Sequence, residues 1–106
     1  MPHVLIIDDS QTNLRLTATI LSRAGHTAFQ AGKAIDGIEI AREKQPDLIL
    51  MDLGLPDIDG ITATHILKAD PESAAPIIAL TGFGSEKDKE HVLAGGCDGF
   101  LAKASR

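Results

Sequence analysis

Three acidic residues stand where two short apolar segments end. Asp8 and Asp9 directly follow the segment His3–Ile7, and Asp52 directly follows the segment Leu48–Met51. Both segments are too short for helices and are typical of buried strands. Because carboxylates avoid buried surroundings, three of them at the tips of core strands indicate chemistry rather than packing.

The three carboxylates would meet at one edge if the two strands are neighbours in one sheet. They would then repel one another unless a positive charge lay between them. A hard divalent cation with oxygen ligands suits such a group, and Mg²⁺ is the natural candidate. A carboxylate not needed for coordination could act as a nucleophile.

Each acid also has a purely structural interpretation. An isolated acid before a helix is usually an N-cap, which is the alternative for Asp9, and a strand-end acid such as Asp52 can simply begin a turn. The grouping of Asp8 with these two favours a functional site. Asp57 and Asp59 are interpreted as turn residues of the following loop.

Composition narrows the class of protein. The chain has 106 residues, which favours one domain, and a net charge of −5 from 15 acidic residues against 10 Lys and Arg. With no basic stripe, direct binding to nucleic acid or to an anionic membrane surface is not expected. Cys97 is the only cysteine, which fits a reducing compartment. No signal peptide and no run of about 18 apolar residues is present, so we expect a soluble, cytoplasmic chain.

Apolar runs alternate with helical patterns along the whole chain. In the second expected helix, Ile35, Ile38 and Ala41 are predicted to face the core. The expected strands are His3–Ile7, Thr27–Ala31, Leu48–Met51, Ile77–Leu80 and Gly99–Ala102, and the expected helices are Ser10–Ala24, Ala34–Lys44, Ile61–Lys68 and Ser85–Ala94.

This alternation predicts an α/β fold with parallel strands joined by right-handed crossovers. We expect a flavodoxin-like, doubly wound five-stranded sheet in the order 2-1-3-4-5. Ligands of such sheets bind beyond the carboxyl ends of the strands, here between the first and third strands. Asp8, Asp9 and Asp52 lie at that point, and the fourth and fifth strands add Thr81 and Lys103.

The same strand tips carry a family resemblance. The chain resembles the receiver domain of two-component response regulators over essentially its whole length up to the fifth strand. Any one matching segment would be a weak signal, but four in order, each at the tip of an expected strand, are a strong one. The segments are Val4–Ser10, Asp47–Pro56 followed by Asp59-Gly60, Ile78–Thr81 and Gly95–Lys103.

The resemblance implies a phosphoacceptor signalling switch. Asp52 would take a phosphoryl group from a histidine of a partner, either a histidine kinase or a histidine phosphotransfer protein. Asp9, Asp52 and the backbone carbonyl of Gly54 would hold Mg²⁺, with Asp8 helping through a water molecule. Such a chain would promote only its own phosphorylation and dephosphorylation, and would not be an enzyme acting on other substrates.

The resemblance also assigns roles on the neighbouring strands. Thr81 would hydrogen-bond the bound phosphoryl group, Lys103 would form an ion pair with it, and Phe100 would be the switch aromatic. Phosphoryl transfer needs mainly in-line positioning and cancellation of charge, which these groups can supply. A changed loop after Thr81 and a changed helix Ser85–Ala94 would then present a different surface to a downstream protein effector.

Two departures from the family pattern stand out. The family usually has proline in a cis bond after the strand-5 lysine, whereas Ala104 follows Lys103. A cis bond before a non-proline residue costs about 2.5–4 kcal/mol, which favours a trans bond here. The family's fifth helix is also missing, so we expect residues 1–106 to form a single receiver domain truncated after strand 5. The apolar face left open would favour a homodimer.

Three other functions remain as alternatives. A Mg²⁺-dependent phosphohydrolase with an aspartyl-phosphate intermediate would share the nucleophile and metal, but it usually needs a cap domain for which there is no room. A receiver-like interaction module that is not phosphorylated is the second. A nucleotide-binding flavodoxin-like module is the third, although no glycine-rich loop follows the first strand.

Overall fold

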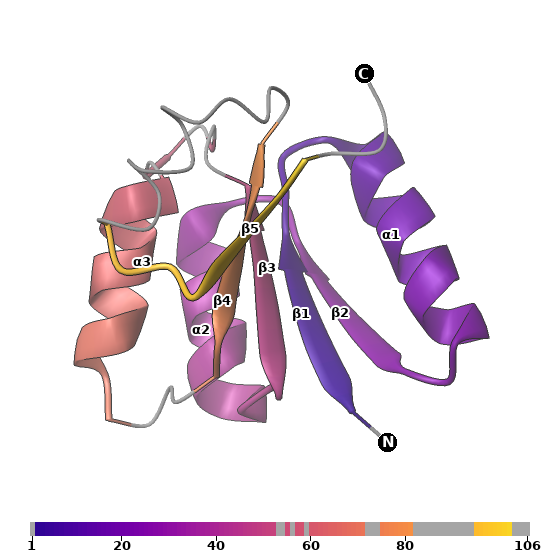
Figure 1. Cartoon of the computed structure of the whole chain (residues 1–106), viewed down its shortest axis with the longest axis horizontal. Coiled ribbons are helices and arrows are strands. Elements are labelled where there is room, and N and C mark those ends of the chain that lie inside the picture. The colour runs from indigo at the N-terminus through magenta and orange to yellow at the C-terminus, as the bar shows by residue number, and fades with distance from the viewer. Residues whose placement is uncertain are drawn as a thin grey trace.

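Five parallel strands form one sheet in the computed structural model of this chain (Figure 1). The sheet order is β2-β1-β3-β4-β5, so the predicted fold class is confirmed. The expected helix Ser85–Ala94 lies outside the described residues, which are 2–52, 55, 57–58, 60–71, 75–81 and 95–102. The elements are β1 (His3–Ile7), α1 (Gln11–Arg23), β2 (Thr27–Ala31), α2 (Ala34–Lys44), β3 (Leu48–Asp52), α3 (Gly60–Ala69), β4 (Ile77–Thr81) and β5 (Gly99–Ala102).

The central strands β1 and β3 bury both of their faces. Leu5 and Ile7 of β1 pack into the core cluster that also contains residues of α2 and α3. Val4 and Ile6 point the opposite way, into a second cluster that contains Leu14 of α1. Figure 1 shows the same division, with α1 on one side of the sheet and α2 and α3 on the other. This two-sided burial explains why Val4–Ile7 of β1 and Leu48–Met51 of β3 are apolar runs.

Helix α2 approaches the sheet through small residues. Ala34, Gly37 and Ala41 are its buried positions, and Ile38 packs against the same core. The prediction that Ile35 faces the core is wrong, because its side chain is 52% exposed. Ile35 directly follows the buried Ala34, and successive residues of a helix point in directions about 100° apart.

The register of the central strands determines which side chains meet at the sheet edge. Ile7 of β1 pairs with Met51 of β3, and β3 continues one residue further than predicted, through Asp52. Asp52 in turn pairs with Leu80 of β4. Within the described residues, no helix is long and apolar enough to cross a membrane.

Candidate functional site

The carboxyl ends of β1 and β3 bring three acids together. Asp8 and Asp52 come one residue after Ile7 and Met51, which are paired across the two strands. One carboxylate oxygen from each of Asp8, Asp9 and Asp52 can be chosen so that all three lie within 4.8 Å of one another. Asp8 and Asp52 are only 1% and 5% exposed, whereas Asp9 is exposed. These three residues are called the acidic cluster below.

The junction between β1 and α1 is held by one bond to β2 and by side-chain bonds between residues close in sequence. The backbone N–H of Asp8 donates to the Ala31 carbonyl at 3.0 Å, which extends the pairing with β2. The Asp8 carboxylate accepts a hydrogen bond from the Ser10 N–H at 2.9 Å, and the Ser10 hydroxyl accepts one from the Asn13 N–H at 3.2 Å. Ser10 is therefore the N-cap of α1, and the structural alternative for Asp9 as that cap is wrong.

The loop after β3 is attached to a distant helix. Asp57 accepts hydrogen bonds from the backbone N–H groups of Ala34 and Ile35, at 2.9 and 3.0 Å. These bonds from Ile35 and Ala34 lower the pKa of the Asp57 carboxyl. The interpretation of Asp57 as a turn residue therefore missed its main contact. The one feature of the sequence that could have indicated this contact was Lys33, a poor N-cap residue in front of a well-patterned helix.

The donor set of the acidic cluster fits a hard divalent cation. All three side chains offer carboxylate oxygens, which Mg²⁺ and Ca²⁺ prefer. Two of these three carboxylates are buried, where their attraction to a cation is screened less than at the surface. The exposed Asp9 leaves one side of the cluster in contact with solvent, so an ion can enter without opening the core.

The remaining predicted site residues belong to the neighbouring strands. Thr81 is the last residue of β4 and pairs with Ala102 of β5, so both strands end at the edge that carries the acidic cluster. Phe100 lies within β5, paired with Ala79. The other two predicted residues, Gly54 and Lys103, lie outside the described residues.

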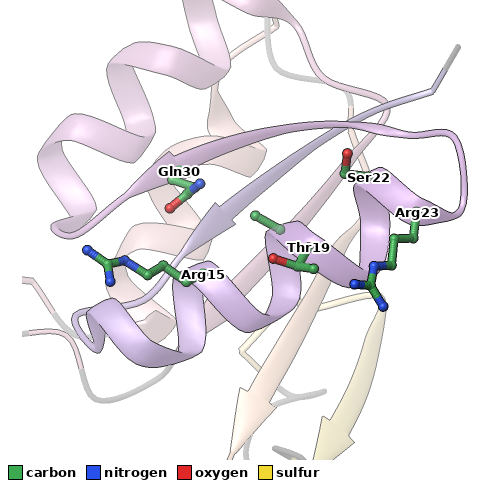
Figure 2. Close-up of a pocket in the computed structure, with 6 residues that line it drawn as sticks. Arg15, Thr19, Ser22, Arg23 and Gln30 are labelled. Carbon is green, nitrogen blue, oxygen red and sulfur yellow. The ribbon is translucent and has the colours of Figure 1, made fainter.

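A separate groove of about 490 Å³ runs between α1 and β2 (Figure 2). Its lining contains two arginines and no carboxylate, so the groove does not suit a cation. The groove also shares no residue with the acidic cluster. The lining residues are Arg15, Ala18, Thr19, Ser22, Arg23 and Gln30.

Known proteins resemble this chain along nearly its whole length. Residues 4–106 match the family model of the response regulator receiver domain. The polar-differentiation response regulator DivK of Brucella anthropi is 35% identical over 101 residues, covering 94% of this chain and 82% of DivK. DivK of Brucella ovis has the same identity and coverage.

Solved structures agree with these sequence matches. The chemotaxis protein CheY4 of Vibrio cholerae is 25% identical with a TM-score of 0.91, covering 100% of this chain and 89% of that one. The receiver domain of a sensor histidine kinase from Pseudomonas aeruginosa is 30% identical with a TM-score of 0.88, covering 99% and 87%. That structure holds a magnesium ion in its active-site cleft. The family match and the shared fold together show that this chain belongs to the response regulator receiver domain family, a class of phosphoacceptor signalling switch.

Proposed function

We propose that Asp52 accepts a phosphoryl group from a histidine of a partner protein. The observation that carries this proposal is the packing of three carboxylates within 4.8 Å around a buried Asp52 at the end of a central strand. A lone structural acid would not need two further acids beside it. The 35% identity to DivK, a response regulator, supports a signalling role for this chain.

The proposed step is a direct displacement at phosphorus. A carboxylate oxygen of Asp52 forms the new O–P bond while the N–P bond to the donor histidine breaks, and the imidazole nitrogen keeps the bonding electron pair. Such transfers depend on in-line positioning and on cancelling charge. Pairing of Asp52 with Leu80 in the sheet fixes the backbone that carries the carboxylate.

Asp8, Asp9 and Asp52 would hold Mg²⁺, together with the backbone carbonyl of Gly54. Bound there, the ion would offset negative charge on the carboxylates and on the incoming phosphoryl oxygens. The all-oxygen donor set of the acidic cluster supports Mg²⁺ rather than a thiophilic metal.

The neighbouring strands would carry the response. The Thr81 hydroxyl would donate to a phosphoryl oxygen, and the Lys103 ammonium would pair with the added charge of about −1.5 to −2. These contacts would shift the loop after Thr81 between two arrangements, with Phe100 as the switch aromatic. The position of Thr81 at the end of β4, one strand from Asp52, supports this assignment.

The proposed partners are proteins. A histidine kinase or histidine phosphotransfer protein would supply the phosphoryl group, a downstream effector would bind the changed surface, and a second copy of the chain is a further candidate. Exposed apolar side chains support protein contacts: Leu16 and Ile20 of α1 are 42% and 56% exposed, and Leu101 of β5 is 54% exposed. We propose a cytoplasmic location, in keeping with the single, unpaired Cys97.

Intact-mass analysis after treatment with acetyl phosphate and Mg²⁺ tests the proposal. The wild-type chain should gain one phosphoryl group and slowly lose it, and Asp52→Ala should gain none. Asp36→Ala, which removes an exposed acid of α2, is the matched control and should be labelled like the wild type.

Three outcomes would contradict the proposal. Equal labelling of Asp52→Ala would place the acceptor elsewhere. A wild-type chain that never gains mass would favour a receiver-like module that is not phosphorylated. Rapid, repeated turnover of phosphomonoesters would favour a phosphohydrolase.

A further inference from the structure

Helix α2 begins without a capping side chain of its own. Its N-cap residue is Lys33, with extended backbone angles (φ −139°, ψ 153°) and no side-chain hydrogen bond to the helix. The first N–H groups of any helix have no partner within the helix and need one from elsewhere. Asp57, more than 20 residues further along the chain, supplies it by accepting bonds from both Ala34 and Ile35.

This remote cap is directional as well as charged. Two carboxylate oxygens take two adjacent N–H groups, at 2.9 and 3.0 Å, which fixes the orientation of Asp57 relative to the helix. The negative charge also lies at the positive end of the helix dipole. The bonds from Ile35 and Ala34 lower the pKa of the Asp57 carboxyl, since they favour its ionised form.

The same loop is anchored by apolar contacts on both sides of Asp57. Leu55 is 8% exposed within the core, and Ile58 packs against the same core cluster. Apolar burial holds a segment out of water but does not by itself fix its orientation. The Asp57 bonds add that missing constraint to the segment that follows Asp52.

The first turn of α2 also contacts the other half of the acidic cluster. A Cβ atom on Gly37 would lie 2.4 Å from Cδ1 of Ile7, so the helix backbone lies directly against this side chain. Ile7 is fully buried and immediately precedes Asp8. One helical turn therefore touches the strand that carries Asp8 and, through Asp57, the loop that follows Asp52.

From this arrangement we infer that Asp57 is a positioning residue for the cation site. By capping α2, it holds the segment that contains Leu55 and Ile58, just after Asp52, in the place that lets Asp52 share one ion with Asp8 and Asp9. The inference rests on the proposed function of the acidic cluster. It adds a residue outside the cluster that sets the affinity for Mg²⁺.

Titration of the isotope-labelled chain with MgCl₂, followed by NMR, tests the inference. Amide shifts of residues around Asp8 and Asp9 give a dissociation constant, and the dispersion of the spectrum shows that each variant is folded. Asp57→Ala should bind Mg²⁺ about tenfold more weakly than the wild type, the lower end of the effect of removing a group that orients metal ligands.

Two control variants separate positioning from other effects. Asp36→Asn removes an exposed negative charge from the first turn of the same helix but leaves the Asp57 cap in place. Asp98→Ala removes a carboxylate of similar kind, which accepts a bond from the Ile77 N–H at 2.9 Å and pairs with Lys68. Because Ile77 begins β4, this bond lies at the opposite end of the sheet. Both controls should bind Mg²⁺ within about twofold of the wild type.

Each outcome decides between the two proposals. If the wild type binds Mg²⁺ and Asp57→Ala binds it equally well, the positioning role is overturned and the proposed function stands. If the wild type shows no response to Mg²⁺, the cation site and the inference fail together. If Asp57→Ala does not fold, Asp57→Asn is measured instead. An effect of Asp57→Asn on the Mg²⁺ affinity no larger than that of Asp36→Asn would mean that only the lost charge matters, and would overturn the inference.

Discussion

The two helices that begin beside the acidic cluster are capped in different ways. Helix α1 is capped by residues close in sequence. The Ser10 hydroxyl accepts a hydrogen bond from the Asn13 N–H, and the Asp8 carboxylate accepts one from the Ser10 N–H. Helix α2 is capped by Asp57, which lies in a loop more than 20 residues further along the chain. The cap beside Asp8 and Asp9 is thus built from residues close in sequence. The cap of α2 depends on contacts between distant parts of the fold.

The largest effect is expected from overpacking the contact between α2 and β1. Gly37→Ala would place a methyl group 2.4 Å from Cδ1 and 2.6 Å from Cγ1 of the buried Ile7. Overpacking of this kind costs about 1–3 kcal/mol, which exceeds the gain of up to about 1 kcal/mol in helix propensity. Urea denaturation followed by circular dichroism should show a lower free energy of unfolding.

Gly32→Ala is the matched control for this change. The nearest atom to its added methyl group, Nε2 of Gln11, lies at an ordinary contact distance of 3.9 Å. Gly32→Ala should therefore leave the urea midpoint nearly unchanged. A Gly37→Ala variant as stable as Gly32→Ala would show that α2 does not press on β1 as described.

Magnesium should stabilise the fold by linking the three acids of the cluster. A ligand that binds only the folded state at ten times its Kd adds about 1.4 kcal/mol, and the melting temperature should rise by several degrees. Asp9→Asn should weaken this response, since it removes one charged ligand from the cluster. Differential scanning calorimetry with and without MgCl₂ measures both values.

Asp36→Asn should retain the wild-type response to MgCl₂, because this acid lies outside the cluster. An equal response from Asp9→Asn would remove Asp9 from the site. No response from the wild type would count against the site as a whole.

The smallest expected effect is a difference between the two caps in how their contribution to stability depends on pH. Ser10→Ala should cost about 1 kcal/mol, the usual loss for an N-cap serine, and this cost should not change with pH because a hydroxyl does not titrate in this range. Asp57 has a pKa below its usual value of 3.8 in the folded state. Its ionised carboxyl therefore stabilises the fold above that value, and this contribution disappears as the pH falls through the lowered pKa.

Urea midpoints measured from pH 7 down to acid pH test the contrast. The difference between the wild type and Asp57→Asn should shrink as the pH falls below the usual value of 3.8, while the difference for Ser10→Ala stays constant. A constant difference for Asp57→Asn would mean that the charge on Asp57 does not contribute to the cap.

Much of the fold was predictable because it depends on local patterns. Short apolar runs marked the strands, and their alternation with helical patterns predicted the sheet order that the structure shows. That order, with parallel pairing, is enough to bring Asp8 and Asp52 to the same edge. The roles assigned to Thr81, Phe100 and Lys103 stay predictions.

Other features depended on contacts that no local pattern records. The exposed position of Ile35 follows from the close approach of α2 to the sheet at Gly37, which turns the neighbouring large side chain outward. The choice of Ser10 over Asp9 as the cap of α1 followed from the start of the helix at Gln11, which places the Ser10 hydroxyl within reach of the Asn13 N–H. Both outcomes needed the orientation of a helix relative to the sheet.

The amino-acid sequence by itself determined the order of the elements, the family and the three acids at the strand tips. Each of these follows from which residue types occupy neighbouring positions. Only the tertiary structure decided that Asp57 caps a helix that precedes it in sequence by more than 20 residues. The physical reason is that a hydrogen bond depends on distance and direction in space, which spacing along the chain does not record when a sheet strand lies between the two partners.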